Sequence, residues 1–161
     1  MDVNHTRWAR SHIALLLGLA LAAGCGGDDS DQKADVFIGT WQVIDGSAMA
    51  RCTGLSPTSS LGGAQVKMTA GTDAPLQVDV RGCLLKFDIN GNTATARANQ
   101  TCMTTFEVNM SNLQIELLVS KADFTVTGTT GLLSMMGTAK TVFLGDCPYD
   151  AMAMATKTTT P

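Results

Sequence analysis

The chain has 161 residues, of which 14 are acidic and 11 are basic, and its formal net charge is −3. From residue 36 onward nine acidic and eight basic residues are scattered without a run, which excludes electrostatic binding of nucleic acid. Both histidines, His5 and His12, precede residue 25. If the leader described next is removed, the 137 remaining residues contain no imidazole, which excludes Ser-His-Asp and Cys-His catalysis and histidine-ligated metal sites.

Residues 1–24 are predicted to be a secretory signal peptide. Arg7 and Arg10 precede an unbroken apolar run over residues 13–23, and small residues follow at its end. A helix needs ~20 apolar residues to cross the hydrocarbon core of a membrane, and this run is about half that length. We therefore expect an export segment and not a permanent membrane span.

The segment LAAGC, from Leu21 to Cys25, resembles the lipobox of bacterial lipoproteins, with Ala22 in place of the commoner leucine. The resemblance implies that the Cys25 thiol is diacylglycerated, that the chain is cut before Cys25, and that the new amino terminus receives a further acyl chain such as palmitate. Several acyl chains together anchor a protein stably. The alternative is an ordinary cleaved signal that leaves Cys25 as a thiol.

Gly26, the residue after Cys25, bears on the expected location of the protein. In enterobacterial lipoproteins, a residue other than aspartate after the lipidated cysteine accompanies delivery to the outer membrane. The expected location is therefore the outer membrane of the cell envelope, on its periplasmic face or at the cell surface, with the membrane as the partner of the lipid anchor.

Residues 25–35 are expected to be a flexible acidic tether. The charged residues of this segment are Asp28, Asp29, Asp31, Lys33 and Asp35. As a flexible coil, the tether would hold the following domain roughly 15–20 Å from the bilayer.

From residue 36 onward, apolar residues recur at every second position, as in LQVDVR, where Leu76, Val78 and Val80 alternate with polar residues. This period is typical of strands with one buried and one solvated face. We expect strands over residues 37–44, 48–53, 65–69, 76–81, 106–110, 113–119, 124–129 and 138–144, besides the hairpin described next. The prediction is an all-β domain over residues 36–154, a single antiparallel barrel or sandwich of about 8–10 strands, followed by a disordered tail over residues 155–161.

The segment CLLKFDINGNTATARA predicts a β-hairpin. Asn90-Gly91 is the preferred pair for a two-residue type I′ turn. That turn would place Phe87 opposite Ala94 and Leu85 opposite Ala96, with large side chains facing small ones on the inner side of the sheet.

Four cysteines besides Cys25 are expected to form two disulfides, because an even number in an exported chain is typical of an oxidising compartment. They are Cys52, Cys83, Cys102 and Cys147. The hairpin register favours a bond between Cys83 and Cys102, which leaves Cys52 for Cys147. The other two connectivities stay open, and the absence of a C-x-x-C spacing argues against a thioredoxin-type motif or a zinc knuckle.

Gly39-Thr40-Trp41 resembles the G-x-W motif of lipocalins and related calycin barrels. The resemblance implies an eight-stranded up-and-down barrel, closed at one end by Trp41 and open at the other to a small apolar ligand. Lipocalins also have a late basic residue that stacks on the tryptophan. No arginine follows Arg97, so this residue is absent unless Lys140 takes its place. The alternative is a core tryptophan in another β fold.

Three sets of residues have the chemistry of metal or catalytic sites but lack the rest of the required pattern. Met135, Met136, Met152 and Met154 offer the soft sulfur that Cu(I) prefers, but methionine also fills cores. Glu107 and Glu116 are the only glutamates and could form a glycosidase-like pair, but both fall on the polar side of the alternation. Asp88, Asn90 and Asn92 suggest calcium, but the closing glutamate of an EF-hand loop is missing. No metal or cofactor is predicted.

The sequence thus favours a non-enzymatic, lipid-anchored envelope protein whose barrel binds a small apolar ligand or lipid. The alternative is a structural or adhesive module that has no ligand and binds other envelope proteins. These hypotheses differ in the interior, which a structural module would fill with its apolar side chains, among them Phe87, Phe106, Phe124 and Phe143.

Overall fold

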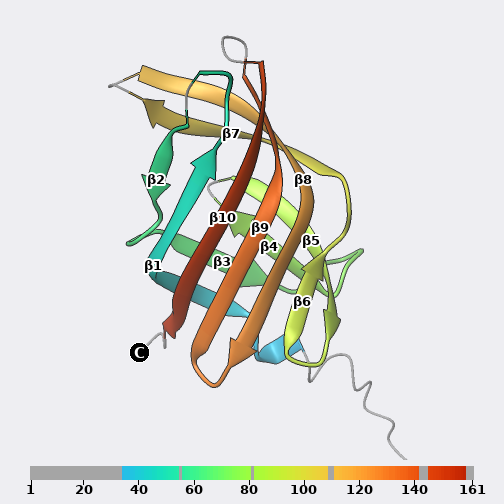
Figure 1. Ribbon diagram of the computed structural model, residues 1–161. Coiled ribbons are helices and arrows are strands. Elements are labelled where there is room, and N and C mark those ends of the chain that lie inside the picture. The colour runs from blue at the N-terminus through green and yellow to red at the C-terminus, as the bar shows by residue number, and fades with distance from the viewer. Residues whose placement is uncertain (1–33, 55, 81, 109–110, 142–144, 159–161) are drawn as a thin grey trace, which may run out of the picture.

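The computed structural model describes residues 34–54, 56–80, 82–108, 111–141 and 145–158, which form one antiparallel β-barrel (Figure 1). Its strands are β1 Gly39–Ala50, β2 Thr58–Ser60, β3 Gln65–Thr69, β4 Leu76–Val80, β5 Cys83–Asn90, β6 Thr93–Ala96, β7 Gln100–Val108, β8 Ser111–Thr127, β9 Thr130–Thr141 and β10 Gly145–Thr158. Among these residues no helix is long and apolar enough to cross a membrane. The expected signal peptide, Cys25 and residues 25–33 of the expected tether lie outside the described residues.

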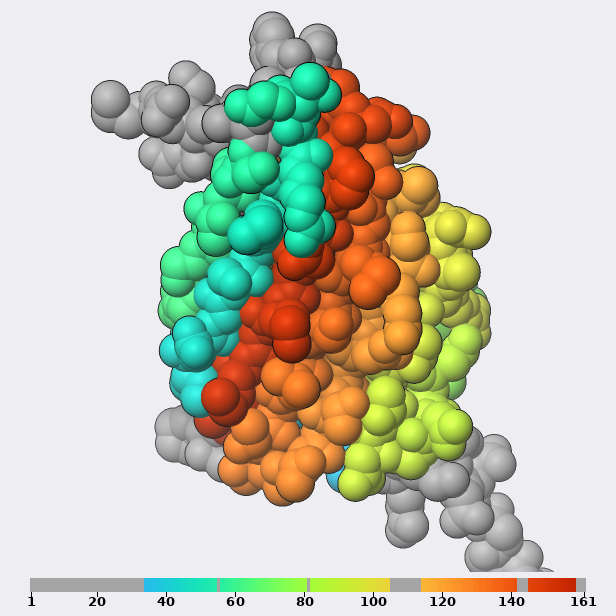
Figure 2. Space-filling model, viewed as in Figure 1, coloured from blue at the N-terminus to red at the C-terminus, as the bar shows by residue number. Residues whose placement is uncertain are grey.

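The sheet closes on itself, which decides between the barrel and the sandwich that the sequence left open. The strands follow one another in space as β1, β3, β4, β5, β6, β8, β9 and β10, and β10 pairs with β1 from Thr40–Thr158 to Ala50–Tyr149. Figure 2 shows the outer wall on the side where β1, β10, β9 and β8 lie side by side.

The two ends of the barrel differ in how they are built. Four strands, β1, β8, β9 and β10, are long and extend past the short strands β3 to β6 at the upper end of Figure 1. In this extension β2 pairs with β1, and β7 pairs with β8. The extension is therefore a sheet with two edges, β2 and β7, whereas the lower half is a closed barrel.

The predicted alternation of buried and exposed residues is confirmed, and β10 shows it most clearly. Its inward side chains are all buried, namely Cys147, Tyr149, Ala151, Ala153 and Ala155, whereas Met152 and Met154 face outward and are exposed. Phe87 and Phe124 are buried as expected, while Phe143 and the side chain of Phe106 lie outside the described part of the chain.

Two pairs of predicted strands are each one continuous strand. Residues 37–44 and 48–53 were separated, yet β1 runs through with a bulge between Val43 and Asp45. Residues 113–119 and 124–129 likewise belong to β8, with a bulge between Val119 and Lys121. A bulge places two successive residues on the outer side and shifts the phase of the alternation, so the pattern breaks while the strand continues.

The hairpin register is offset by two residues from the prediction. Asn90 pairs with Thr93, so Gly91-Asn92 form the turn and Phe87 faces Ala96 instead of Ala94. Gly91, at the first central position, has a φ of +59°, whereas Asn92 at the second is not among the described residues with a positive φ, and this combination is typical of a type II′ turn and not of the expected type I′. An offset of two keeps every side chain on its predicted face.

The predicted tail is wrong for residues 155–158, because β10 continues to Thr158. Ala155 is buried against the core, and the Thr158 hydroxyl donates a hydrogen bond of 2.8 Å to the carbonyl oxygen of Thr40. Pairing with β1 thus orders a segment whose threonines are compatible with a strand but which lacks apolar alternation beyond Ala155. Residues 159–161 of the expected tail are outside the described residues.

Both favoured disulfides are confirmed. Cys52 bonds to Cys147 at a sequence separation of 95, and Cys83 bonds to Cys102 at a separation of 19. In the chain-entropy model these closures stabilise the fold by ~4.7 and ~3 kcal/mol, respectively. The second bond joins β5 to β7, two strands that are not neighbours in the hydrogen-bonded order, and so holds the edge of the extension against the barrel.

Candidate functional site

The lower end of the barrel is sealed by aromatic side chains. The Trp41 and Phe124 rings meet edge to face with centroids 4.9 Å apart, and Phe37 packs on Phe124 at 6.4 Å. The Trp41 indole Nε1 donates a buried hydrogen bond of 2.7 Å to the carbonyl oxygen of Phe37. A Cβ at Gly131 would lie 2.0 Å from the Phe124 ring, so the packing there requires glycine.

The basic residue that lies over Trp41 is Lys157, and Lys140 does not take this place. The Lys157 ammonium lies 5.9 Å from the Trp41 ring centroid and donates to the carbonyl oxygens of Asp35 and Val36 at 3.0 and 3.2 Å. Lys140 is instead an exposed residue of β9. Lys157 lies in the segment that was expected to be a disordered tail, so the sequence offered no reason to expect its contact with Trp41.

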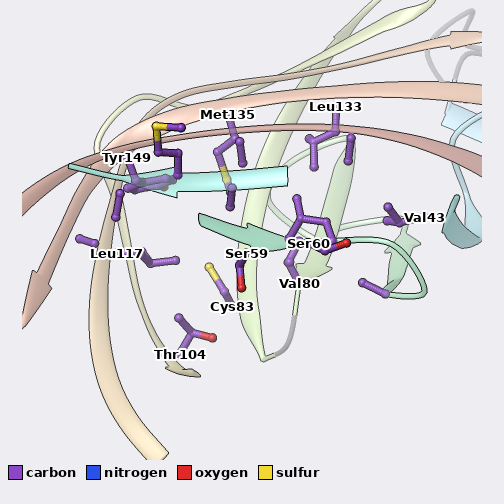
Figure 3. Close-up of a pocket in the computed structure, with 18 of the residues that line it drawn as sticks. Val43, Ser59, Ser60, Val80, Cys83, Thr104, Leu117, Leu133, Met135 and Tyr149 are labelled. Carbon is purple, nitrogen blue, oxygen red and sulfur yellow. The ribbon is translucent and has the colours of Figure 1, made fainter. Parts of the chain in front are cut away.

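The upper end holds an apolar cavity of about 230 Å³ (Figure 3). In this view Tyr149, Met135 and Leu133 line one side, and Leu117, Thr104 and Cys83 lie across from them. Exposed residues of β2, Thr58 to Ser60, complete the lining, so the cavity is partly open to solvent beside β2. An apolar cavity of about 150 Å³ binds benzene, so this one has room for about nine or ten non-hydrogen atoms.

Small inward residues on the long strands create this space. The alanines of the lining are Ala48, Ala50, Ala64, Ala139, Ala151 and Ala153. The neighbouring strands β1 and β10 carry alanine at the same level where Ala48 pairs with Ala151, and Ala50 of β1 pairs with Tyr149. Alanine side chains are too small to fill the interior at this level, where leucine or phenylalanine would fill it, and the cavity remains.

The lining contains no charged side chain, and its polar groups are few. Tyr149 is 7% exposed, and within the described structure its buried Oη has no hydrogen-bond partner. Burial raises the pKa of the Tyr149 phenol to about 12, because the phenolate would lose its hydration. Thr104 on β7 is buried as well, and its hydroxyl is a second buried polar group in the lining, beside the more exposed Thr58, Ser59, Ser60 and Gln65.

Gly137 makes room for the tyrosine ring. It pairs with Tyr149 across β9 and β10, and a Cβ there would lie 3.0 Å from the ring and 1.9 Å from the Leu118 carbonyl oxygen. The Cys52–Cys147 disulfide lies two residues before Tyr149 on the same strand. The phenol is thus carried by a rigid part of the fold.

The four methionines weighed for copper do not form one group. Met135 lines the cavity, whereas Met136, Met152 and Met154 are exposed on the outer wall. Within the described ranges no three His, Cys, Asp or Glu side chains are grouped so as to hold a metal ion.

The structure does not pair the two glutamates that were considered as a glycosidase-like site. Glu116 stands opposite Met103 and Lys140 in register, and Glu107 stands opposite Asn112, so the glutamates are not paired with each other. The side chain of Glu107 lies outside the described part.

Asp88 accepts hydrogen bonds of 2.8 to 3.2 Å from the Arg97 guanidinium, which lowers the pKa of its carboxyl and takes up its oxygens. Asn90 and Asn92 flank Gly91 in the hairpin turn.

Sequence reasoning missed Tyr149, Thr104 and Gly137. A usable signal lies in CPYDAMAMA, where the inward positions read Cys, Tyr, Ala, Ala, Ala while the methionines point outward. A tyrosine followed by alanines on the same face of a strand indicates a cavity beside the phenol ring.

Comparison with protein-family models, with curated proteins and with solved structures gave no match to this chain.

Proposed function

We propose that this protein is a lipid-anchored, non-enzymatic protein of the bacterial cell envelope that binds a small apolar molecule inside its barrel. The observation that carries the proposal is the cavity of about 230 Å³, lined by apolar side chains and by no charged one, above a sealed lower end. Apolar cavities with a few polar groups are the usual form of small-molecule sites.

The cavity also separates the proposal from its alternative, a structural or adhesive module that binds other envelope proteins. Such a module gains stability from a filled interior, and an empty space of this size costs it packing energy. The aromatic side chains Trp41, Phe37 and Phe124 instead gather at the lower end and leave alanines around the space above. Retention of this space is expected if a ligand fills it.

The lipid anchor is supported by the LAAGC segment and by the two disulfides, which suit an exported protein. We place the protein at the outer membrane, with acyl chains on Cys25 inserted in the bilayer. The denatured intact mass tests this directly. We expect a chain that begins at Cys25, heavier by its acyl groups and lighter by the four hydrogens of two disulfides. An unmodified thiol at Cys25 would overturn the anchor, and a Cys25→Ser variant should leave the membrane fraction.

Ligand binding is tested on the full-length protein with indane, an uncharged hydrocarbon of nine carbons that suits the cavity. Binding to the folded state alone raises stability, by about 2.7 kcal/mol when the ligand is at a hundred times its Kd. We expect indane to raise the thermal midpoint of the protein, and Ala151→Leu to abolish the shift because leucine fills the cavity from β10. An equal shift in both proteins, or none in either, would overturn the proposal.

A further inference from the structure

We propose that the cavity takes the hydrocarbon tail of a single-chain amphiphile, with the tail directed toward the aromatic side chains of the lower end and the polar head in an opening beside Ser59. This inference rests on the proposed function, because it names the class of ligand that the same cavity takes and the way that the ligand lies in it.

Ser59 marks the opening of the cavity. It pairs with Ala48 across β2 and β1, and directly opposed residues of an antiparallel pair point to the same side of the sheet. Ala48 lines the cavity, so Ser59 faces inward as well, and Figure 3 draws it among the lining side chains. Ser59 is nevertheless exposed, as are its neighbours Thr58 and Ser60. An inward side chain that solvent reaches lies where the interior opens.

The polar side chains of the lining are divided between this opening and the interior. The exposed ones are Thr58, Ser59, Ser60 and Gln65, and the buried ones are Thr104 and Tyr149. Tyr149 Oη is buried, so it is not among the groups at the opening. The hydroxyls beside β2 are therefore the polar groups that a ligand meets where it enters.

The backbone of β2 adds hydrogen-bonding groups to these hydroxyls. Hydrogen-bonded pairs alternate along an antiparallel ladder, and β1 is bonded to Pro57 and Leu61 on either side of β2. Ser59 therefore bonds to β1 as well, whereas the backbone groups of Thr58 and Ser60 point away from it. Within the described part of the chain β2 pairs with β1 alone, so these groups lie on a free edge. A polar head finds donors, acceptors and water there.

The opening carries no net charge that would select the sign of the head. The lining contains no charged side chain, and Arg51, which follows the lining residue Ala50, forms an ion pair of 2.5 Å with Asp150. A charged head remains hydrated in the opening, which avoids the cost of burying an ion. The site should therefore select the length of the tail and not the charge of the head.

The interior suits one hydrocarbon tail. Along β1 the lining extends from Val43 to Ala50, which is roughly 20 Å at about 3.3 Å per residue. Its lower part is apolar and reaches Val66, which pairs with Trp41 of the sealed end. A cavity of about 230 Å³ over such a length is narrow and holds about nine carbons. The two chains of a diacyl lipid exceed it.

The first test is a chain-length series, measured by titration calorimetry on the full-length protein in polymer-bound discs of its own membrane. The probes are hexanoate, octanoate, decanoate and dodecanoate. Discs from cells that lack the protein are the blank for partitioning into lipid. We expect the affinity to rise about fourfold per added methylene up to decanoate, whose tail fills the cavity, and then to level off because further carbons stay in solvent.

Ala153→Leu tests the direction of the tail. Ala153 lines the cavity near its lower end, because it pairs with Leu133, which pairs with Phe124 of the aromatic group. Leucine adds three carbons there, so a tail that points downward loses about that length. We expect the affinity to level off at octanoate in this variant, while the affinity for hexanoate stays within about twofold of wild type.

A charge at position 59 tests the place of the head. At low ionic strength, Ser59→Lys should strengthen binding of octanoate by about threefold and weaken binding of octyltrimethylammonium by a similar factor, and Ser59→Asp should reverse both changes. The matched control is Ser120→Lys, because Ser120 is an exposed serine of β8 outside the lining, four strands from β2 in the hydrogen-bonded order. It should change neither affinity. An unchanged circular dichroism spectrum shows that each variant is folded.

The outcomes separate this inference from the proposed function. If indane raises the thermal midpoint but the alkanoates show no rise with chain length, or Ala153→Leu does not shift the levelling-off, the ligand class is wrong while binding in the cavity stands. Equal affinities for both charged probes in wild type, Ser59→Lys and Ser59→Asp overturn the place of the head and the proposal with it. If neither indane nor any alkanoate binds above the blank, the proposed function fails and this inference fails with it.

Discussion

Two alanine-to-leucine substitutions on β10 should have opposite effects on stability if the interior is open at one level and packed at another. Ala151 and Ala155 are both buried and point the same way from the same strand. Ala151 lines the cavity, and its register partners Ala48 and Met135 line it too. Ala155 is outside the lining and pairs with Gly131, where the Phe124 ring leaves no room for a Cβ.

The magnitudes follow from the three carbon atoms that each substitution adds. At position 151 they enter empty apolar space, and burial at ~0.8 kcal/mol per carbon stabilises by about 2.4 kcal/mol. Loss of leucine rotamer freedom offsets about 0.5–1 kcal/mol of that gain. At position 155 the same atoms overpack the core, which costs about 1–3 kcal/mol. The free energies of unfolding of the two variants should therefore differ by about 3 kcal/mol.

Equilibrium unfolding in urea, followed by tryptophan fluorescence, measures this difference. The midpoint should rise for Ala151→Leu and fall for Ala155→Leu, with the slope m unchanged because the surface exposed on unfolding is nearly the same. Equal destabilisation of both variants would refute the reasoning, since it would mean that the space beside Ala151 is filled by protein.

Three further predictions concern single residues around the two ends of the barrel. Lys157→Ala should lower the free energy of unfolding by about 1–2 kcal/mol, because it removes a cation–π contact with Trp41 and two hydrogen bonds, and Lys157→Arg should retain most of it in the same urea assay. Gly137→Ala should cost about 3 kcal/mol or more, because its Cβ would meet the Leu118 carbonyl oxygen, and a thermal midpoint equal to wild type would contradict the pairing of β8 with β9. Tyr149 is the only tyrosine, so its phenolate absorbance should titrate near pH 12 in the folded protein and near pH 10 in denaturant. Since only the unfolded chain ionises between these values, the contribution of Tyr149 to stability should be level below pH 10 and fall by about 2–3 kcal/mol up to pH 12, and this fall should be missing in Tyr149→Phe.

Period-two alternation was enough to predict an all-β domain, because each strand buries one face whatever its neighbours are. The disulfide pairs were predictable for a related reason. The hairpin keeps Cys83 on the inner face under either register, so Cys102 remains its nearest partner. These features depend on local pattern and on one short-range contact.

The strand boundaries and the cavity depended on contacts between distant segments. Thr158 and Lys157 are ordered by pairing with β1, more than a hundred residues earlier, and this segment lacks the apolar alternation that indicated the other strands. The cavity arises where Ala48 of β1 pairs with Ala151 of β10, and only the register between the strands reveals that pairing. The AMAMA segment was interpreted through its methionines, whereas its inward alanines shape the site.

The most direct test of a ligand-binding barrel is native mass spectrometry of the full-length protein, extracted gently from its own membrane, beside the Ala151→Leu variant. The account predicts that the wild-type protein carries a stoichiometric small adduct, which leaves on denaturation, and that the variant does not carry it. A bare lipidated chain in both samples would contradict the account and would favour a structural module that recognises another protein of the envelope.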